Sequence, residues 1–287
     1  MTTRLGLFVL LAAAIFVAPL AAAEFTLEKT DDGVTVNLDG KLFTKYVKLV
    51  QNKPVLSPVI GPTGKPMTRP LDEGDHPHHT SLWLTHGDVN GVDFWTNKGG
   101  LIEHLEYQKV ESGETGVLAI KTAWHDKADA IVGYETRTMT FSAAQGVRRI
   151  DFDITFTAGD KPVTFGQTKE GSFGVRVWPT MTVDKNGGKI LNSEGQTNLD
   201  AWSKPAAWVD YVGQVDGETL GIAILNHPDS LRFPTPWHVR TYGLFAANPF
   251  MHEALELKAG ESFRLRYAVL LHAGDTAAAD IAGQFKR

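Results

Sequence analysis

Apolar and polar residues alternate with a period of two along much of this 287-residue chain. In residues 149–156, every second side chain is apolar, and the residues between them are charged or carry a hydroxyl group. Residues 263–271 continue the pattern, with Arg264, Arg266 and Ala268 at alternate positions. This alternation predicts β-strands with one buried and one solvated face. Further β-rich runs cover residues 34–38, 42–50, 81–84, 117–124, 136–141, 173–177, 208–212 and 220–225.

Turn residues separate these runs, and helix signals are nearly absent. The pairs Asp39-Gly40, Asn186-Gly187 and Asp216-Gly217 are typical of two-residue β-hairpin turns. One helix is predicted over residues 277–285, capped by Asp275 or Thr276. With no repeat and no linker, the pattern predicts one all-β domain over residues 24–287. We expect a large antiparallel β-sandwich with a short C-terminal helix.

The first 23 residues have the pattern of a signal peptide. Arg4 precedes an apolar run over residues 5–20, and three alanines ending at Ala23 fit a cleavage site. We therefore expect export to the periplasm or the cell exterior. The run is short for a membrane span of about 20 residues, so no membrane contact is expected after cleavage.

Composition excludes several classes of function. The chain has no cysteine, which excludes disulfides, thiolate metal sites and cysteine nucleophiles. Its net charge of −5, without a basic stripe, argues against a nucleic-acid partner. The sequence does not specify an oligomeric state.

Residues 66–100 and 164–249 break the alternation and are rich in His, Trp, Asn, Gly and Pro. Polar and aromatic residues on the loops of a rigid scaffold are where function usually lies. Tryptophans in these two stretches favour a pocket, and the candidates are Trp83, Trp95, Trp202, Trp208 and Trp237.

The first stretch contains the cluster Asp75-His76-Pro77-His78-His79. Imidazole titrates near neutral pH and is a common metal ligand, so acid–base chemistry, substrate contact or metal binding are all open. A metal site would use His76, His78 and a distant third ligand, although the spacing is not that of H-E-x-x-H or of a cysteine–histidine finger. A purely structural role is the remaining interpretation. No cofactor is predicted, and a divalent metal is possible.

The segment that follows carries oxygen-bearing side chains at Asp88, Asn90 and Asp93. Their spacing around Gly91 fits either a turn held by side-chain hydrogen bonds or a calcium loop. The turn is favoured because the helices and the later Glu of an EF-hand are missing.

The second stretch supplies charged and aromatic candidates. Lys169 and Glu170 could present a carboxylate base beside a cation, or form only a solvated ion pair. Trp237, His238 and Arg240 place an aromatic face, a titratable ring and a five-donor cation within four residues, a mixture suited to sugars. Catalytic candidates are His78, His79, Glu170 and His238; substrate-binding candidates are His76, His86, Asp88, Asn90, Asp93, Lys169, Arg176, Asn226, His227, Trp237, Arg240 and Asn248.

Together these motifs resemble an exported bacterial family labelled "methane oxygenase PmoA". The motifs are residues 75–79, 86–95, 169–171, 208–211, 234–240 and 248–250, and the resemblance spans residues 42–271. It implies no established activity and no assigned catalytic residue. The predicted sandwich is similar to the galactose-mutarotase-like supersandwich of many sugar-active proteins, which is an analogy of fold only.

The oxygenase label itself does not fit. Particulate methane monooxygenase is a membrane copper enzyme, and this chain has no membrane span beyond its leader. The predicted mature N-terminus is Glu24, whereas copper-dependent polysaccharide oxygenases use an N-terminal histidine.

The sequence therefore predicts an exported carbohydrate-active protein that binds a small sugar or glycan. His78 or His79 with His238 would act as acid–base groups and Glu170 as a base, in hydrolysis, elimination or epimerisation. Arg176 and Arg240 would anchor a negative or polar group. Two alternatives stay open, which are a non-catalytic carbohydrate-binding protein and a metal-dependent hydrolase using His76 and His78.

Overall fold

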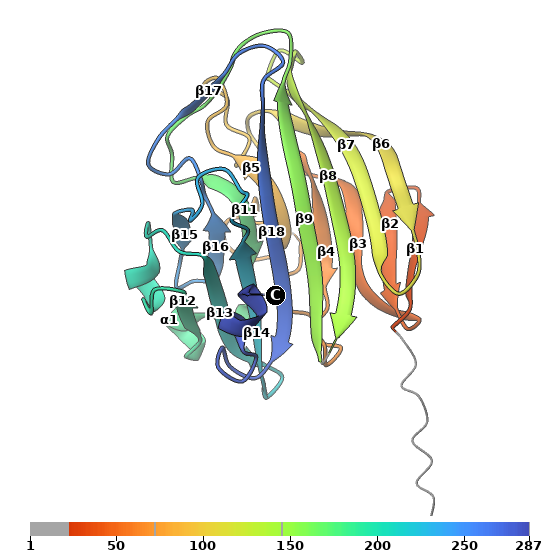
Figure 1. The fold of residues 1–287 in the computed structure, drawn as a ribbon, viewed down its shortest axis with the longest axis vertical. Helices are drawn as coiled ribbons and strands as arrows, with labels where there is room; N and C mark the ends of the chain where they lie inside the picture. The colour runs from red at the N-terminus through yellow and green to blue at the C-terminus, as the bar shows by residue number, and fades with distance from the viewer. Residues whose placement is uncertain (1–22, 72, 145, 287) are drawn as a thin grey trace, which may run out of the picture.

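The computed structural model describes residues 23–71, 73–144 and 146–286. Two eight-stranded antiparallel sheets face each other (Figure 1), which confirms the predicted antiparallel β-sandwich. The predicted signal peptide lies outside the described residues, except for Ala23. Within the described part of the chain, no helix is both long enough and apolar enough to cross a membrane.

In each sheet most neighbouring strands are consecutive in the sequence, and two junctions join strands that are far apart in the chain. The first sheet runs β1 (Phe25–Thr30), β2 (Gly33–Leu38), β3 (Lys41–Val50), β4 (Lys53–Val59), β5 (Leu82–His86), β11 (Gly171–Arg176), β16 (Leu244–Ala247) and β15 (Trp237–Val239). The second sheet runs β12 (Lys189–Asn192), β13 (Trp208–Val215), β14 (Glu218–Asn226), β18 (Ser262–Ala273), β9 (Val147–Ala158), β8 (Ile131–Ala144), β7 (Gly116–His125) and β6 (Leu101–Glu111). The smaller elements are the strand pair β10 (Val163–Phe165) and β17 (Leu255–Leu257), and the short helices η1 (Pro179–Met181), α1 (Val183–Asn186), η2 (Asn198–Ala201) and α2 (Ile281–Phe285).

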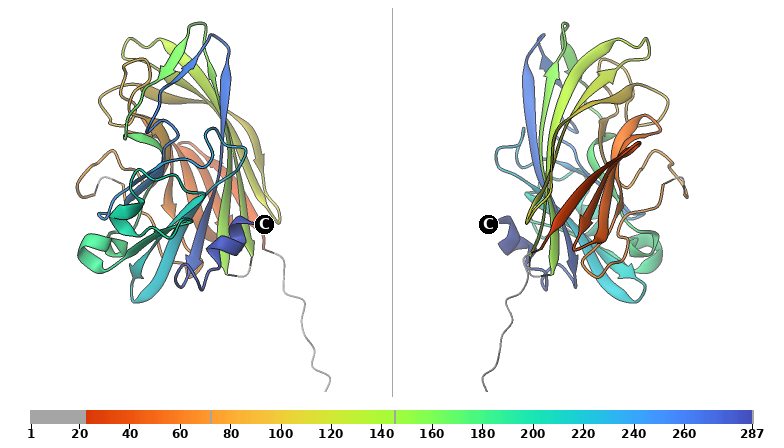
Figure 2. Two further views of the ribbon diagram at one scale, coloured as in Figure 1. Left: turned by 60° about the vertical axis from the view of Figure 1, so that its left-hand side comes forward. Right: turned by 90° about the vertical axis from the view of Figure 1, so that its right-hand side faces the viewer.

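The main core lies between the two sheets, which Figure 2 shows as separate layers. On β9, Ile150, Phe152, Ile154 and Phe156 point into this space, while the residues between them face outward. Their partners on β18 are apolar at matching register positions. The period of two in the sequence therefore corresponds directly to the inner and outer faces of these long strands.

Two of the three predicted hairpin turns are confirmed. Asp39-Gly40 joins β2 to β3 and Asp216-Gly217 joins β13 to β14, and all four residues have positive φ. This is the geometry of a type I′ turn. The prediction for Asn186-Gly187 is wrong, because Asn186 ends α1 and Gly187 caps it with a left-handed φ of 70°.

The predicted C-terminal helix exists but is shorter than expected. It begins at Ile281 rather than Ala277, with Asp280 as the N-cap accepting a hydrogen bond from the Gly283 amide. The Asp275 side chain accepts from the amides of residues 277 and 278 and so forms a separate turn. The helix packs on the outer face of the second sheet.

The centre of the first sheet is buried on both faces. On β5, Leu82 and Leu84 enter the main core, whereas Trp83 points outward and packs with Trp95 in a second apolar cluster. Gly174 on the neighbouring β11 leaves room for this indole, because a Cβ there would lie 2.9 Å from Trp83 Cζ2. The outer face of this sheet therefore provides an apolar floor under the loops that cover it.

Candidate functional site

A cleft of about 600 Å³ opens over this outer face of the first sheet. It gathers side chains from five segments that are far apart in the sequence. Seven of the predicted site residues line it together: His76, His78, His79, Lys169, Glu170, His238 and Arg240. The remaining lining residues are Trp95, Thr96, Leu199, Thr241 and Tyr242.

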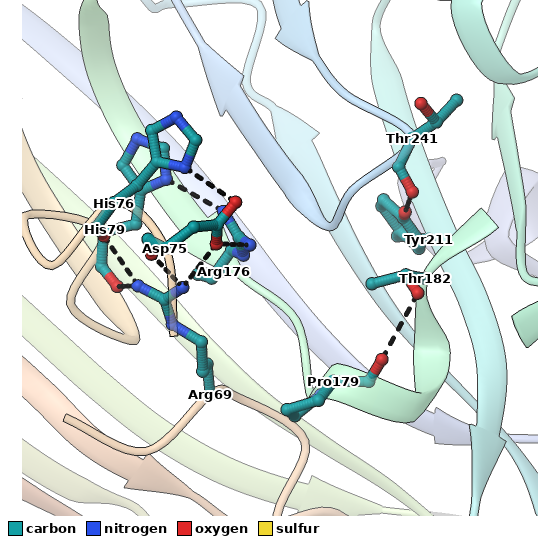
Figure 3. A network of polar contacts seen from close by, with 9 residues as sticks. All are labelled: Arg69, Asp75, His76, His79, Arg176, Pro179, Thr182, Tyr211 and Thr241. Atoms are coloured by element: carbon teal, nitrogen blue, oxygen red, sulfur yellow. Dashed lines mark hydrogen bonds and ion pairs between the residues drawn. The ribbon is translucent and has the colours of Figure 1, made fainter. Parts of the chain in front are cut away.

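Strand pairing brings these segments together. β5 pairs with β11, β11 with β16, and β16 with β15, so three sequence-distant regions become neighbours. The loop of residues 75–79, called the histidine loop below, precedes β5. Glu170 directly precedes β11, and His238 is the middle residue of β15. The turn after β15 is held from the second sheet, because the Tyr211 hydroxyl donates to the Thr241 carbonyl at 2.9 Å (Figure 3).

Two buried arginines fix the histidine loop, and both meet Asp75 (Figure 3). Arg69 is 4% exposed and donates to the carbonyl oxygens of Asp75, His76 and His79 at 2.6, 2.7 and 3.1 Å. Arg176 is 6% exposed and donates to Asp75 Oδ1 at 2.7 Å. Because these bonds hold both backbone and side chain, the loop presents its imidazoles at defined positions.

His79 is held as a neutral ring. Arg176 Nη1 donates to His79 Nδ1 at 3.1 Å, so the imidazole proton is on Nε2. Burial, together with the nearby His78 and Arg176, lowers the pKa of His79 far below its usual value. The ring stacks between His76 and Trp83, with centroid distances of 5.0 and 5.7 Å. His79 is therefore a rigid N–H donor.

His78 is partly exposed to the cleft and makes no hydrogen bond within the described part of the chain. Burial, and then the positive charge of Lys53, lowers its pKa to about 4. Lys53 itself lies fully buried on β4, with Nζ 3.2 Å from Asn52 Oδ1, and burial lowers its pKa to about 8. His78 thus offers an uncharged imidazole without a protein partner at neutral pH.

His238 is 2% exposed, and burial followed by the charge of Arg240 lowers its pKa to about 3. Arg240 Nε donates to His238 Nε2 at 3.2 Å, which leaves the proton on Nδ1. That Nδ1 has no partner among the described residues. A buried polar atom without a partner carries a free-energy cost and indicates a functional constraint or an absent ligand.

Glu170 is the one carboxylate among the described residues that line the cleft. Its Oε1 lies 3.5 Å from Lys169 Nζ, and the two side chains are 36% and 53% exposed. An ion pair this open contributes little to stability. Both charged groups are therefore free to exchange their mutual contact for a ligand.

Tyr242 is a site residue that the sequence analysis missed. Its ring stacks on His76 at a centroid distance of 5.2 Å and lies 4.7 Å from the Arg176 guanidinium. Burial raises the pKa of its hydroxyl. The available signal was proximity in the chain, because Tyr242 lies two residues after Arg240, in the turn that follows β15.

Four predicted site residues lie below or beside the cleft and have structural roles. His86 points into the main core, where burial lowers its pKa to about 4 and Nε2 bonds to the Gly166 carbonyl. Asp88 accepts from the Gly91 amide, as the turn interpretation requires. Asn90 joins the same turn to Thr164, and Asp93 caps the amides of Trp95 and Thr96.

The stacking role predicted for Trp237 is wrong. Its ring is 0% exposed in the main core, and Nε1 donates to the Ala206 carbonyl at 2.9 Å. Adjacent residues of β15 point to opposite faces, so the strand that sends His238 into the cleft sends Trp237 into the core. Trp208 likewise packs outside the cleft, against the C-terminal helix.

The other four candidates also lie away from the cleft or are already occupied. Asn226 is buried and accepts from the Thr235 amide. Asn248 is buried and donates to the Thr168 carbonyl. His227 lines a different groove, on the outer face of the second sheet. Arg176 supports the site from below through its bonds to Asp75 and His79.

Within residues 23–71, 73–144 and 146–286, no group of three or more His, Asp or Glu side chains is arranged to hold a metal ion. His76 Nδ1 instead lies 2.9 Å from Asp75 Oδ2. The metal site considered for His76 and His78 therefore has no third ligand here.

Several solved structures are similar to this chain at low sequence identity. The GH36 α-galactosidase AgaB from Geobacillus stearothermophilus matches 88% of this chain and 39% of its own, at 14% identity and a TM-score of 0.40. The Slr1438 protein from Synechocystis sp. PCC 6803 matches 92% of this chain and all of its own, at 13% identity and a TM-score of 0.36. The polysaccharide lyase BACCELL_00875 matches 90% and 34%, at 12% identity and a TM-score of 0.32.

The chain spans about two fifths of the length of the galactosidases that it matches. No curated protein matches it. The family described as "Family of unknown function (DUF6807)" matches residues 33–286. Membership of the PmoA-like family stays a prediction. Because the DUF6807 match covers nearly all of the described residues, the chain belongs to the DUF6807 family.

Proposed function

We propose that the protein binds a sugar or glycan in the cleft over the first sheet and transfers protons on it. The observation that carries the proposal is that His78, which makes no hydrogen bond among the described residues, and Glu170, which is held only by an open 3.5 Å contact with Lys169, line one cleft. Most buried polar groups in a folded protein are already hydrogen-bonded. Two titratable groups left available at the same cleft are typical of acid–base catalysis.

The roles follow from the hydrogen bonds. Glu170 can take a proton from a sugar hydroxyl or an acidic C–H and return it to the ligand as the acid that it then becomes, and the neutral His78 can accept a second proton from the ligand or from water. His79 and His238 are neutral rings that donate N–H groups. Such fixed, uncharged donors stabilise negative charge that develops on oxygen in a transition state. Hydrolysis, elimination and epimerisation can each use a proton acceptor such as Glu170.

The test uses purified wild-type protein with galactan, polygalacturonate and chondroitin sulfate, and follows new reducing ends, unsaturated products and epimers. Glu170→Gln and His78→Gln should each lower turnover by about 10²–10⁴-fold, the usual contribution of an acid or base. His227→Gln, in the groove of the second sheet, is the matched control and should keep wild-type turnover.

Three outcomes separate the hypotheses. Unchanged turnover in both cleft variants would overturn the assignment of acid and base. Glycan affinity without any product would make the protein a non-catalytic binding protein. Absence of both binding and product would overturn the whole proposal. We also propose that this chemistry takes place outside the cytoplasm. N-terminal sequencing of the protein recovered from the producing cells tests this, and the mature chain should start at Glu24.

A further inference from the structure

The cleft carries more positive than negative charge. Its lining includes the cations Lys169 and Arg240 but one carboxylate, Glu170, among the described residues. Directly below, Arg69 and Arg176 share the single carboxylate Asp75. The four cleft histidines cannot be counted as balancing this charge, because imidazole is either neutral or positive. An uncharged ligand would bury this excess of positive charge without neutralising it.

The three arginines in and below the cleft differ in whether their Nη groups are already hydrogen-bonded to the protein. The Nη groups of Arg69 and Arg176 donate hydrogen bonds to Asp75, to loop carbonyls and to His79 Nδ1. Arg240 is different, because only its Nε is used, in the 3.2 Å bond to His238. Its two Nη groups make no hydrogen bond within the described residues.

Arg240 is nevertheless fixed in place. Its guanidinium carbon lies 5.5 Å from the centre of the Trp202 ring, a cation–π distance, while Nε is tied to His238. Contacts at both places limit rotation of the guanidinium before any ligand arrives. A planar guanidinium with two free Nη groups matches the geometry of a carboxylate or sulfate and binds it through two parallel hydrogen bonds.

Lys169 supplies a second cation on the same cleft. Its Nζ has no closer partner in the described residues than Glu170 at 3.5 Å, and its side chain is 53% exposed. An anionic group bound at Arg240 would bring Lys169 a stronger partner. It would also release Glu170 from its ion pair with Lys169, which leaves that carboxylate available as a base.

We propose that the sugar bound in this cleft is acidic, and that the terminal nitrogens of Arg240, assisted by Lys169, bind its anionic group. The inference rests on the proposed function and names its substrate class. The anionic group is a carboxylate, as in a uronic acid, or a sulfate ester, and the binding experiment distinguishes the two.

The test compares matched ligands by calorimetry with the wild-type protein. The pairs are methyl glucuronide with methyl glucoside, methyl galacturonide with methyl galactoside, and galactose 6-sulfate with galactose. The acidic member should bind at least about tenfold more tightly in one pair, the effect of one charge-assisted bidentate contact of about 1.4 kcal/mol or more. Sodium acetate and sodium sulfate at the same concentrations control for charge alone.

Arg240→Gln should remove this preference, so that the acidic and the neutral member of the pair bind with affinities within about twofold of each other. Lys169→Met should reduce the preference less and is the second variant if Arg240→Gln fails to fold. Arg266→Gln, which removes an arginine from the groove of the second sheet, is the matched control and should keep the preference.

The outcomes distinguish this inference from the function on which it rests. Neutral sugars that bind as tightly as acidic ones, with Arg240→Gln unchanged, would overturn the inference and leave the sugar-binding function intact. Failure of every sugar to bind would overturn both. Equal binding of acetate or sulfate ions and of the acidic sugars would show an anion site without sugar recognition, which also overturns the inference.

Discussion

The outer faces of the two sheets differ in how their arginines are paired with carboxylates. On the second sheet, Arg149 has Asp151 and Arg264 has Asp153, so each cation has its own carboxylate, and these side chains are between 32% and 49% exposed. On the first sheet, Arg69 and Arg176 are nearly buried and share Asp75. Exposed, matched pairs contribute little to stability, whereas buried and unequal charge is costly and is retained for a reason.

Cavity size does not distinguish these two faces. The groove on the second sheet, beside the C-terminal helix, has a volume of about 590 Å³, close to the 600 Å³ of the cleft. Its histidine, His227, is already bonded to Arg266 and to the amide of Asp229. In the cleft, His78 and the Nη groups of Arg240 have no such partners in the described residues. The state of hydrogen bonding, rather than the volume, distinguishes the two faces.

The largest expected effect is a loss of stability in acid that comes from the histidines on and beneath the first sheet. The pKa values of His78 and His86 are lowered to about 4 and that of His238 to about 3, compared with about 6.5 in an unfolded chain. The unfolded chain therefore binds protons first, and stability falls as the pH falls from about 6.5 to 4. The slope should reach about 1.4 kcal/mol per pH unit for each of the buried His86 and His238, and less for the partly exposed His78, whose charge is screened by water.

Urea unfolding at pH 7, 6, 5 and 4 measures this slope. His238→Gln should flatten it, because one titrating group is removed. His252→Gln, at an exposed histidine outside the cleft, is the matched control and should keep the wild-type slope. A stability that stays constant from pH 7 to 4 would contradict the neutral state assigned to the cleft histidines.

The next largest effect is the difference in unfolding free energy between removing the charge of Asp75, which two arginines share, and removing that of Asp153, which pairs with Arg264 alone. Asp75→Asn leaves two buried guanidiniums without a counter-charge and should lower the free energy of unfolding by about 2 kcal/mol. The figure is below that for a fully buried pair, because the Asp75 side chain is 56% exposed and water screens it. Asp153→Asn, opposite Arg264 on the second sheet, should cost less than about 1 kcal/mol. Equal costs at pH 7 would remove the contrast between the two faces.

The fold could be predicted from the sequence wherever one face of a strand meets water. β9 alternates cleanly because its outer face is solvated, and β18 does so as far as Arg266, beyond which Ala268 and Leu270 are covered by the C-terminal helix. β5 does not, because all five of its residues are buried, with Trp83 under the histidine loop. The Asn186-Gly187 pair was misassigned because the same left-handed glycine that closes a hairpin also caps a helix.

The site could be predicted in part for a related reason. The types of residue and the two stretches that carry them are local features, and the sequence contains them. Which stretches meet depends on the order β5-β11-β16-β15, which is set by long-range pairing and leaves no local signal. The direction of each side chain depends on strand register, so Trp237 and His238 could not be separated without the strand that holds them.

The smallest effect tests the apolar floor of the cleft. Gly174→Ala would place a methyl group 2.9 Å from Trp83 Cζ2, so the indole must shift, at a cost of about 1–2 kcal/mol in unfolding free energy. Because Trp83 stacks on His79 at 5.7 Å, the shift should also tilt that imidazole and lower sugar affinity severalfold. Thr138→Ala, on the outer face of the second sheet, should change stability by less than about 0.5 kcal/mol and leave affinity unchanged. Urea unfolding and calorimetry on the same preparations measure both quantities. A Gly174→Ala protein that loses stability but keeps full affinity would show that the Trp83 floor supports the fold and not the position of His79.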